Sequence, residues 1–496
     1  MTVAVAPPPQ APICEKETFS LPDQMRRGIF LCLSGQTIAR ILNFAFMVIL
    51  ARLLTPRDYG LFNLASTVVG LAVAFGDWGL GSAFIHRQDD LKENASAAYS
   101  LNLLITLAGS VLLVIAAPAV AVFYKEPAAK SLLWILSLGF FLRGATFIHE
   151  ASIRKSMRYG RWQTVLLTST ILYGAVAIIA ARRGTGPWSL AWAVLAMQGG
   201  AAVLLVRMSG LSLSFRIDRA RWRELLSYGK HVLAGGLVWA ALLQADKIVV
   251  GKYLGAAALG AYAVAYNYGR MPLALLGSAV GEVMFSGLAR VQNDLAEVRR
   301  LLLRSVSTLA VWAFPLAAAG LLLSKDAVSV FLGDRWSAAA APLRIFAFAF
   351  PLTIVAAPFP SLYLALGRPR LSFWMGLAAA PFLFTAIFAG LAGGAVGVAT
   401  GVALVMLGIA VAHFCVAGRI VGLSAPQFIR PLVFPALCSF VVFALAEATD
   451  LIIKTGFPYL RLFIQGGMFL VFYGAVVGLK EIRRNRILNV LPEPMT

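Results

Sequence analysis

The sequence predicts an all-α polytopic membrane protein of about fourteen transmembrane helices, built as two parallel-repeat six-helix bundles with two extra C-terminal helices. Three observations lead to this fold class. Of the 496 residues, 60% are hydrophobic and 13% are charged, and the mean hydropathy is +0.81. Soluble domains carry about 25% charged residues. Basic residues collect in alternate links between apolar runs, and one segment of the first half recurs in the second half.

A helix that crosses a bilayer needs about 20 consecutive apolar residues, and this length defines the elements. The link lengths leave no room for a folded extramembrane domain. The predicted spans, in chain order, are Gly28–Leu53, Tyr59–Phe84, Ala95–Phe123, Ser131–Ile153, Trp162–Ala181, Gly186–Val206, Leu225–Leu254, Ala258–Phe285, Leu301–Leu323, Ala341–Leu366, Leu371–Leu391, Gly394–Ile420, Phe428–Ala448 and Tyr459–Leu479.

The distribution of lysine and arginine predicts the orientation of these spans. The link between the fourth and fifth spans holds Arg154, Lys155, Arg158 and Arg161, whereas the link between the eleventh and twelfth spans holds no charge. Basic links face the cytoplasm, so we expect an even number of spans with both termini cytoplasmic. The net charge of +21 then reports topology and contact with anionic membrane lipids, and it is no sign of nucleic-acid binding.

An internal repeat relates the two halves of the chain. At a shift of 200 residues, Arg52 aligns with Lys252 and Gly60 aligns with Gly260, and each copy joins one long apolar run to the next. An even number of spans separates the copies, so they share one orientation in the membrane. Two like bundles on either side of a cleft suit alternating access.

The repeat and the links divide the chain into six segments. The basic link between the halves contains Trp222 and is expected to form a short amphipathic helix on the membrane surface. The predicted segments are a disordered N-terminal tail (1–24), an N-terminal six-helix bundle (25–206), a cytoplasmic amphipathic linker (207–224), a C-terminal six-helix bundle (225–420), helices 13 and 14 (421–480) and a cytoplasmic tail (481–496).

Several motifs resemble those of the polysaccharide-export flippases of the Wzx/WzxC type, in the MOP superfamily of multidrug, oligosaccharidyl-lipid and polysaccharide exporters. LARLLTPRDYG at residues 50–60 is similar to the family's first helix ending, and FGDWGLGSAFIHR at 75–87 to its second. QADKIVVGKYLG at 244–255 is similar to the start of its second half. FLGDRW at 331–336 resembles the loop before its tenth helix, and Gly422–Ser424 with Arg430 and Pro431 the entry to its thirteenth.

This resemblance implies a substrate and a location. The substrate would be an undecaprenyl-pyrophosphate-linked oligosaccharide, turned across the bacterial inner membrane for lipopolysaccharide, capsule or exopolysaccharide assembly. Proteins that polymerise the glycan and set its chain length are possible partners. The implied protein is a transporter rather than an enzyme, and it needs neither cofactor nor metal. Its headgroup site would be a wet, cationic cavity open sideways to the bilayer.

Basic residues inside the predicted spans are the candidates for this cavity. They are Arg40, Arg143, Lys247 and Arg270. A charge at the centre of a span costs about 2.5–3.5 kcal/mol on insertion scales, so it needs water or a partner. Arginine suits pyrophosphate because its guanidinium offers paired donors. The simpler interpretation is a side chain near a helix end that extends to the lipid headgroups.

Acidic residues in the same spans are candidates for ion coupling, namely Asp77, Asp246 and Glu282. Asp77 lies among glycines and fits a helix end equally well. Glu282 could instead pair with Arg270. The deep His413 is expected to be a packed, hydrogen-bonded residue rather than a proton relay.

Two other functions remain open from the sequence. One is an ion-coupled multidrug or metabolite antiporter of the same superfamily, which would have a lone acid and few cations in its cavity. The other is a polymerase or transferase of the same pathway, which would need a long external loop or a nucleotide motif, and the sequence has neither. The glycine pairs at 199–200, 235–236 and 393–394 are expected to allow close helix contacts.

Overall fold

The computed structural model describes residues 21–76, 91–156, 159–453 except 212, 214 and 369, and 459–474 except 462, 470 and 472. All regular secondary structure in these residues is helical. The elements are α1 (Leu21–Leu53), α2 (Pro56–Gly76), α4 (Leu91–Tyr124), α5 (Ala128–Lys155), α6 (Tyr159–Arg182), α7 (Trp188–Ser209), α8 (Arg219–Tyr253), α9 (Gly255–Arg290), α10 (Leu295–Ala327), η1 (Val328–Leu332), η2 (Asp334–Ala339), α11 (Ala340–Val355), α12 (Pro358–Ala365), α13 (Arg370–Gly390), η3 (Leu391–Gly393), α14 (Gly394–Val421) and α15 (Ala425–Ile453).

The helices match the predicted spans in order and approximate position. Nine spans within the described residues are long and apolar enough to cross a membrane. The predicted span Ala341–Leu366 is divided into α11 and α12. Its prolines explain the break, since Pro351 and Pro358 cannot donate a helical hydrogen bond. The predicted cytoplasmic tail at 481–496 and residues 1–20 of the predicted N-terminal tail (1–24) lie outside the described residues, whereas residues 21–24 already belong to α1.

The link between the halves differs from its prediction as a surface helix. Gly210 has a φ of 66° and ends α7, and the described residues from 210 to 218 are not helical. Helix α8 then begins at Arg219, because the Asp218 side chain accepts the backbone N–H of Arg221 at 3.1 Å and caps the helix. The indole of Trp222 donates to the carbonyl of Ala97 at 3.0 Å, so this end of α8 packs on α4 rather than floating on the surface.

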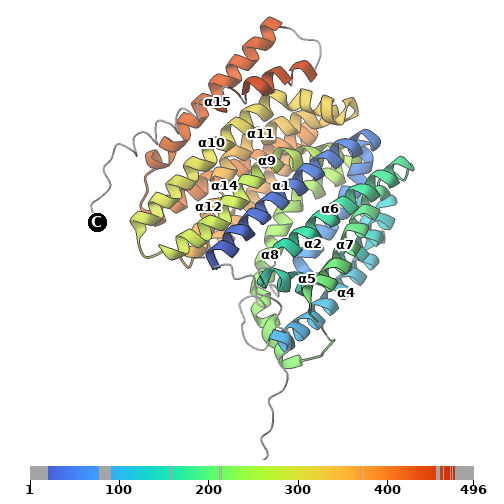
Figure 1. Cartoon of the computed structure of the whole chain (residues 1–496). Coiled ribbons are helices and arrows are strands. Elements are labelled where there is room, and N and C mark those ends of the chain that lie inside the picture. The colour runs from blue at the N-terminus through green and yellow to red at the C-terminus, as the bar shows by residue number, and fades with distance from the viewer. Residues whose placement is uncertain are drawn as a thin grey trace, which may run out of the picture.

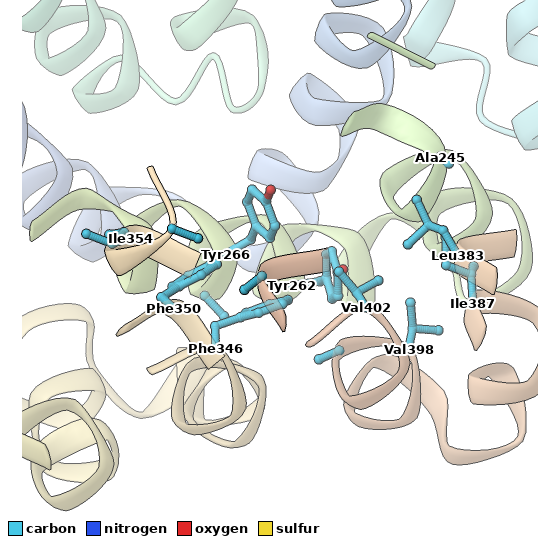
Figure 2. Packing of buried hydrophobic residues seen from close by; sticks show 14 of the residues in the cluster. Ala245, Tyr262, Tyr266, Phe346, Phe350, Ile354, Leu383, Ile387, Val398 and Val402 are labelled. Carbon is cyan, nitrogen blue, oxygen red and sulfur yellow. The ribbon is translucent and has the colours of Figure 1, made fainter. Parts of the chain in front are cut away.

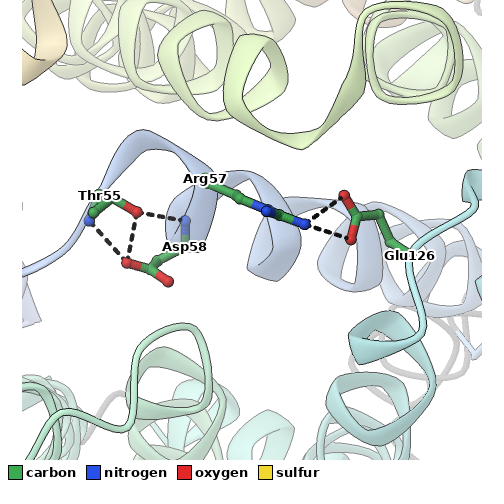
Figure 3. Close-up of polar contacts among 4 residues, drawn as sticks. All are labelled: Thr55, Arg57, Asp58 and Glu126. Carbon is green, nitrogen blue, oxygen red and sulfur yellow. Dashed lines mark hydrogen bonds and ion pairs between the residues drawn. The ribbon is translucent and has the colours of Figure 1, made fainter.

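Successive helices run up and down, so their links fall on two opposite faces. We call the face that carries the α5–α6, α7–α8 and α9–α10 links the basic face, and the opposite one the distal face. The distal α1–α2 corner is held by a reciprocal cap: Thr55 and Asp58 exchange side-chain and backbone hydrogen bonds of 2.7 to 3.2 Å (Figure 3). Next to it, Arg57 forms a 3.3 Å ion pair with Glu126, in the α4–α5 link of the same half.

The two halves lie side by side and meet where α2 crosses α9. In Figure 1, α4, α5, α6 and α7 gather on one side and α10, α11, α14 and α15 on the other. At the crossing, a Cβ on Gly60 would lie 1.6 Å from the carbonyl oxygen of Ala256, and a Cβ on Gly260 would lie 1.8 Å from that of Pro56. The crossing therefore brings backbone against backbone. Outside the second half, α15 packs on α10 through Val442 and Ala318.

Candidate functional site

A buried carboxylate lies between α8 and α9, where Asp246 has 4% of its surface exposed. Its Oδ2 accepts a hydrogen bond from the hydroxyl of Tyr262 at 2.7 Å, and its Oδ1 accepts the backbone N–H of Lys247 at 2.8 Å. Tyr262 is fully buried. The carboxylate therefore points into the contact between the two helices, where its hydrogen bonds offset the loss of water.

The neighbouring Lys247 points another way, as adjacent residues on a helix must. Its Nζ donates to Oε1 of Gln244 at 3.0 Å and lies 5.1 Å from the centre of the Tyr266 ring. Gln244 in turn packs on Gly70 of α2, where a Cβ would lie 2.6 Å from its amide nitrogen. The ammonium is thus held by an amide oxygen and an aromatic face rather than by a carboxylate.

Aromatic rings of α9 and α11 pack against one another beside Asp246 and Lys247, and we call these rings the aromatic wall. Tyr262 and Tyr266 of α9 pack edge-on against Phe346 of α11 at 5.6 and 5.2 Å between ring centres (Figure 2). Phe346 stacks on Phe350 at 5.4 Å. The wall fixes both tyrosine rings, and so it fixes the partners of Asp246 and Lys247.

Arg270 extends the cluster along α9. Tyr262, Tyr266 and Arg270 follow one another at intervals of four residues, which places them on one face of the helix. Arg270 is exposed on this face, and its charge lies near the Tyr266 hydroxyl and Lys247. The structure therefore brings together two of the four predicted cations.

The other two predicted cations, Arg40 and Arg143, lie on α1 and α5. No contact among the described residues joins either guanidinium to Lys247 or Arg270. One nitrogen of Arg40 is buried without a hydrogen-bond partner, and the Arg143 side chain is exposed. At about 1.5 Å per residue, the backbones of Arg40, Arg143 and Arg270 all lie about 20 Å from the distal ends of their helices.

None of these cations is neutralised by a carboxylate in the part of the chain that the structure describes. The ion pairs found there join other residues: Arg57 with Glu126, Arg154 with Glu150, Arg221 with Asp218, Arg300 with Glu297, and Arg461 with Asp326. By this count the three arginines lie at similar distances from the distal ends of their helices, well inside a span about 30 Å long, and none has a carboxylate partner among the described residues.

The remaining acidic candidates fall outside this description. Asp77 is not among the described residues, and the backbone of Glu282 belongs to α9 while its side chain is not described.

His413 is packed as expected: its Nδ1 is hydrogen-bonded to the hydroxyl of Tyr363 at 3.2 Å, and its ring stacks on Phe359 and Tyr363. Among described residues, no group of His, Cys, Asp and Glu is arranged to hold a metal ion.

Gln244, Tyr262 and Tyr266 were not singled out as site residues by the sequence. The four-residue spacing of Tyr262, Tyr266 and Arg270 was the available signal, because it aligns hydroxyls with a charge on one helix face.

Comparisons of the sequence place it among polysaccharide proteins. Residues 49–341 match the family described as Polysaccharide biosynthesis protein. The chain is 26% identical over 344 residues to the succinoglycan biosynthesis transport protein ExoT of Rhizobium meliloti (strain 1021), covering 68% of each protein. It is 24% identical over 425 residues to the lipopolysaccharide biosynthesis protein WzxC of Escherichia coli (strain K12), covering 82% of this chain and 84% of that protein.

Comparisons of the structure agree on the fold. The lipid II flippase MurJ in an inward closed conformation superposes with a TM-score of 0.77 at 16% identity, over 92% of this chain and all of that one. An inward-facing multidrug MATE transporter of the MOP superfamily gives 0.62 at 16% identity, over 79% and 98%. At these identities the likeness establishes the helical transporter fold that the sequence predicted.

Proposed function

We propose, from the premise that this chain belongs to the polysaccharide biosynthesis protein family, that it turns an undecaprenyl-pyrophosphate-linked oligosaccharide across the membrane by alternating access. It is a flippase of the Wzx type in the MOP superfamily. The relatives and structural neighbours are transporters, which agrees with the expectation of a protein that is no enzyme. The pyrophosphate linkage and the identity of the lipid belong to the proposal.

One observation supports the proposal most directly: Arg40, Arg143 and Arg270 lie at similar distances from the distal ends of their helices without a carboxylate partner among the described residues. A lipid-facing arginine at that depth is costly, so these side chains require water or a counter-charge. An anionic headgroup supplies both, because it enters with its own hydration and binds guanidinium through paired hydrogen bonds. A cationic drug or metabolite would be repelled instead.

The proposed direction follows from the basic links. With both termini cytoplasmic in the inner membrane, the headgroup enters from the basic face and leaves on the distal, periplasmic face. The lipid tail stays in the bilayer while the glycan crosses between the two halves. On the far side, a polymerase and chain-length proteins would receive it.

Replacing Arg40, Arg143, Lys247 or Arg270 singly with glutamine is expected to lower glycan export by about tenfold to hundredfold, because each change removes one charge-assisted hydrogen bond to phosphate. Glutamine keeps much of the side-chain length and removes the charge. Export is measured in a strain that depends on this protein for surface glycan, at matched membrane levels.

Arg300→Gln is the matched control, because Arg300 is exposed on α10 and already pairs with Glu297. It is expected to change export by less than about twofold, as surface ion pairs contribute little. Normal export by all four glutamine variants would contradict the cationic site. Reconstituted vesicles with a fluorescent lipid-linked oligosaccharide then test the linkage: the pyrophosphate form is expected to be translocated faster than the monophosphate form.

Asp246 is the proposed coupling residue, and Asp246→Asn separates its charge from its packing. Asparagine still accepts the Tyr262 hydrogen bond, so we expect a folded protein whose transport no longer responds to an imposed ion gradient. Tyr262→Phe is the companion change: it removes a hydrogen bond to the carboxylate while keeping a group that can bind the ion. Gradient-dependent transport by the asparagine variant, measured in vesicles with an imposed proton or sodium gradient, would exclude Asp246 from coupling.

A further inference from the structure

Two cations related by the internal repeat reach from one half of the molecule to the other. Arg52, at the end of α1, donates to the backbone carbonyls of Val330 and Ser329 in the η1 segment of the second half. Lys252, at the end of α8, donates to the carbonyl of Phe123 in the last turn of α4 in the first half and lies 4.4 Å from the centre of the Phe123 ring. Each half thus supplies one cation and receives the other.

The two receiving segments are also alike. Residues 122–126 are VFYKE and residues 330–334 are VFLGD. Each turns at its fourth residue through a positive φ, 57° at Lys125 and 94° at Gly333. Lys125 is the one non-glycine residue with positive φ in the described chain. A residue with positive φ at this place ends the helix and leaves carbonyls of its last turn free to accept a hydrogen bond from outside.

An apolar plug lies beside the Arg52 contact and also spans the halves. Met47 and Ala51 of α1 pack with Val264 of α9 and with Val328, Leu332 and Trp336. All of these elements meet toward the distal face. The plug and the two cation contacts therefore close that face between the halves.

We propose that Arg52 and Lys252 form a matched pair of latches that hold the distal face shut and must open together when that face opens. The Arg52 latch comprises Arg52 with Ser329 and Val330; the Lys252 latch comprises Lys252 with Phe123. Arg52 is exposed and Lys252 is partly exposed, so water can take over their hydrogen bonds. Each latch is therefore a reversible closure of modest strength.

This inference rests on the proposed alternating access for its use in transport, but its test needs no substrate. A single reporter, Val264→Cys, is placed in the buried plug after Cys14, Cys32, Cys415 and Cys438 are replaced with serine. A membrane-impermeant maleimide is added to each side of membrane vesicles in turn. The rate of labelling from the distal side measures how often that face opens.

Arg52→Gln and Lys252→Gln are each expected to raise the labelling rate about tenfold, the effect of losing one charge-assisted hydrogen bond, and the double change to raise it further. Lys252→Arg is expected to keep the slow rate, because a guanidinium can still donate to Phe123. Arg57→Gln is the matched control: it removes a cation from the same face, but its partner Glu126 lies in the same half.

The outcomes are decisive. A double variant that labels at the parent rate, with unchanged melting temperature and elution, overturns the latches. A response to Arg52→Gln alone overturns the matched pair. Faster labelling in both single variants would support the latches. If the parent protein also translocates no lipid-linked glycan in vesicles, the latches are retained and the proposed function is rejected.

Discussion

Replacing Gly260 with alanine is expected to separate α2 from α9 and to remove most of the folded protein from the membrane. The added Cβ would lie 1.8 Å from the carbonyl oxygen of Pro56 and 2.9 Å from the backbone nitrogen of Gly60. These are backbone atoms of a helix, so no side-chain rotation can relieve the clash. Overpacking a tight contact costs about 1–3 kcal/mol even where side chains can move, and here whole helices must shift.

The repeat makes the same prediction for Gly60, whose Cβ would lie 1.6 Å from the carbonyl oxygen of Ala256. Membrane levels and melting temperature in detergent measure both variants. Gly199→Ala is the control: it lies inside α7 with no atom within 4 Å of its added Cβ, so alanine's higher helix propensity should stabilise it slightly. If Gly260→Ala melts with the control, the crossing is looser than described.

These glycines show where sequence reasoning reached its limit. Gly60 and Gly260 were visible as markers of the repeat, but the pattern did not show that they face each other's helices. The glycine pairs were expected to make the close contacts instead. Gly199, Gly393 and Gly394 have no atom within 4 Å of an added Cβ, and Gly200 meets a side chain of Leu172. A small residue permits close approach, but only the partner helix decides whether approach occurs.

The sequence likewise revealed only some of the residues in the polar cluster around Asp246. Asp246 and Lys247 could be found from the sequence, because charge inside an apolar run is costly and therefore conspicuous. Their tyrosine partners could not, since Tyr262 and Tyr266 are compatible with many helix positions and meet Asp246 and Lys247 only through the α8–α9 packing; Gln244 is a local partner, three residues before Lys247 on α8. Arg40, Arg143 and Arg270 lie at similar distances from the distal ends of their helices, which follows from the helix boundaries. Their convergence on one ligand remains a proposal.

The fold was the most predictable feature, because hydropathy and the alternation of basic links act over the whole chain. The link at 210–218 was less so. An apolar–basic pattern there suggested a surface helix, but Gly210 ends α7 and the Asp218 cap starts α8, and the described residues between them are not helical. Two local backbone signals thus outweighed the amphipathic pattern.

Trp336→Ala is expected to destabilise the protein by about 3–5 kcal/mol, the usual cost of removing a buried tryptophan. Trp336 is fully buried in η2 of the second half, and it also makes two contacts with the first half: its Nε1 donates to the carbonyl of Ala51 at 2.9 Å, and its ring packs edge-on to Tyr59 at 5.1 Å. The loss therefore falls partly on the contact between the halves, and melting in detergent measures it.

Two further variants separate the contributions of Trp336. Trp336→Phe keeps an aromatic ring against Tyr59 and loses the indole hydrogen bond, so it should cost about 1 kcal/mol plus a smaller packing loss. Trp374→Ala removes a tryptophan that is 60% exposed on α13 and should change the melting temperature little. Because Trp336 packs beside Val264 in the plug, Trp336→Ala should also speed maleimide labelling of Val264→Cys from the distal side. Equal melting of Trp336→Ala and Trp374→Ala would mean that Trp336 does not join the two halves.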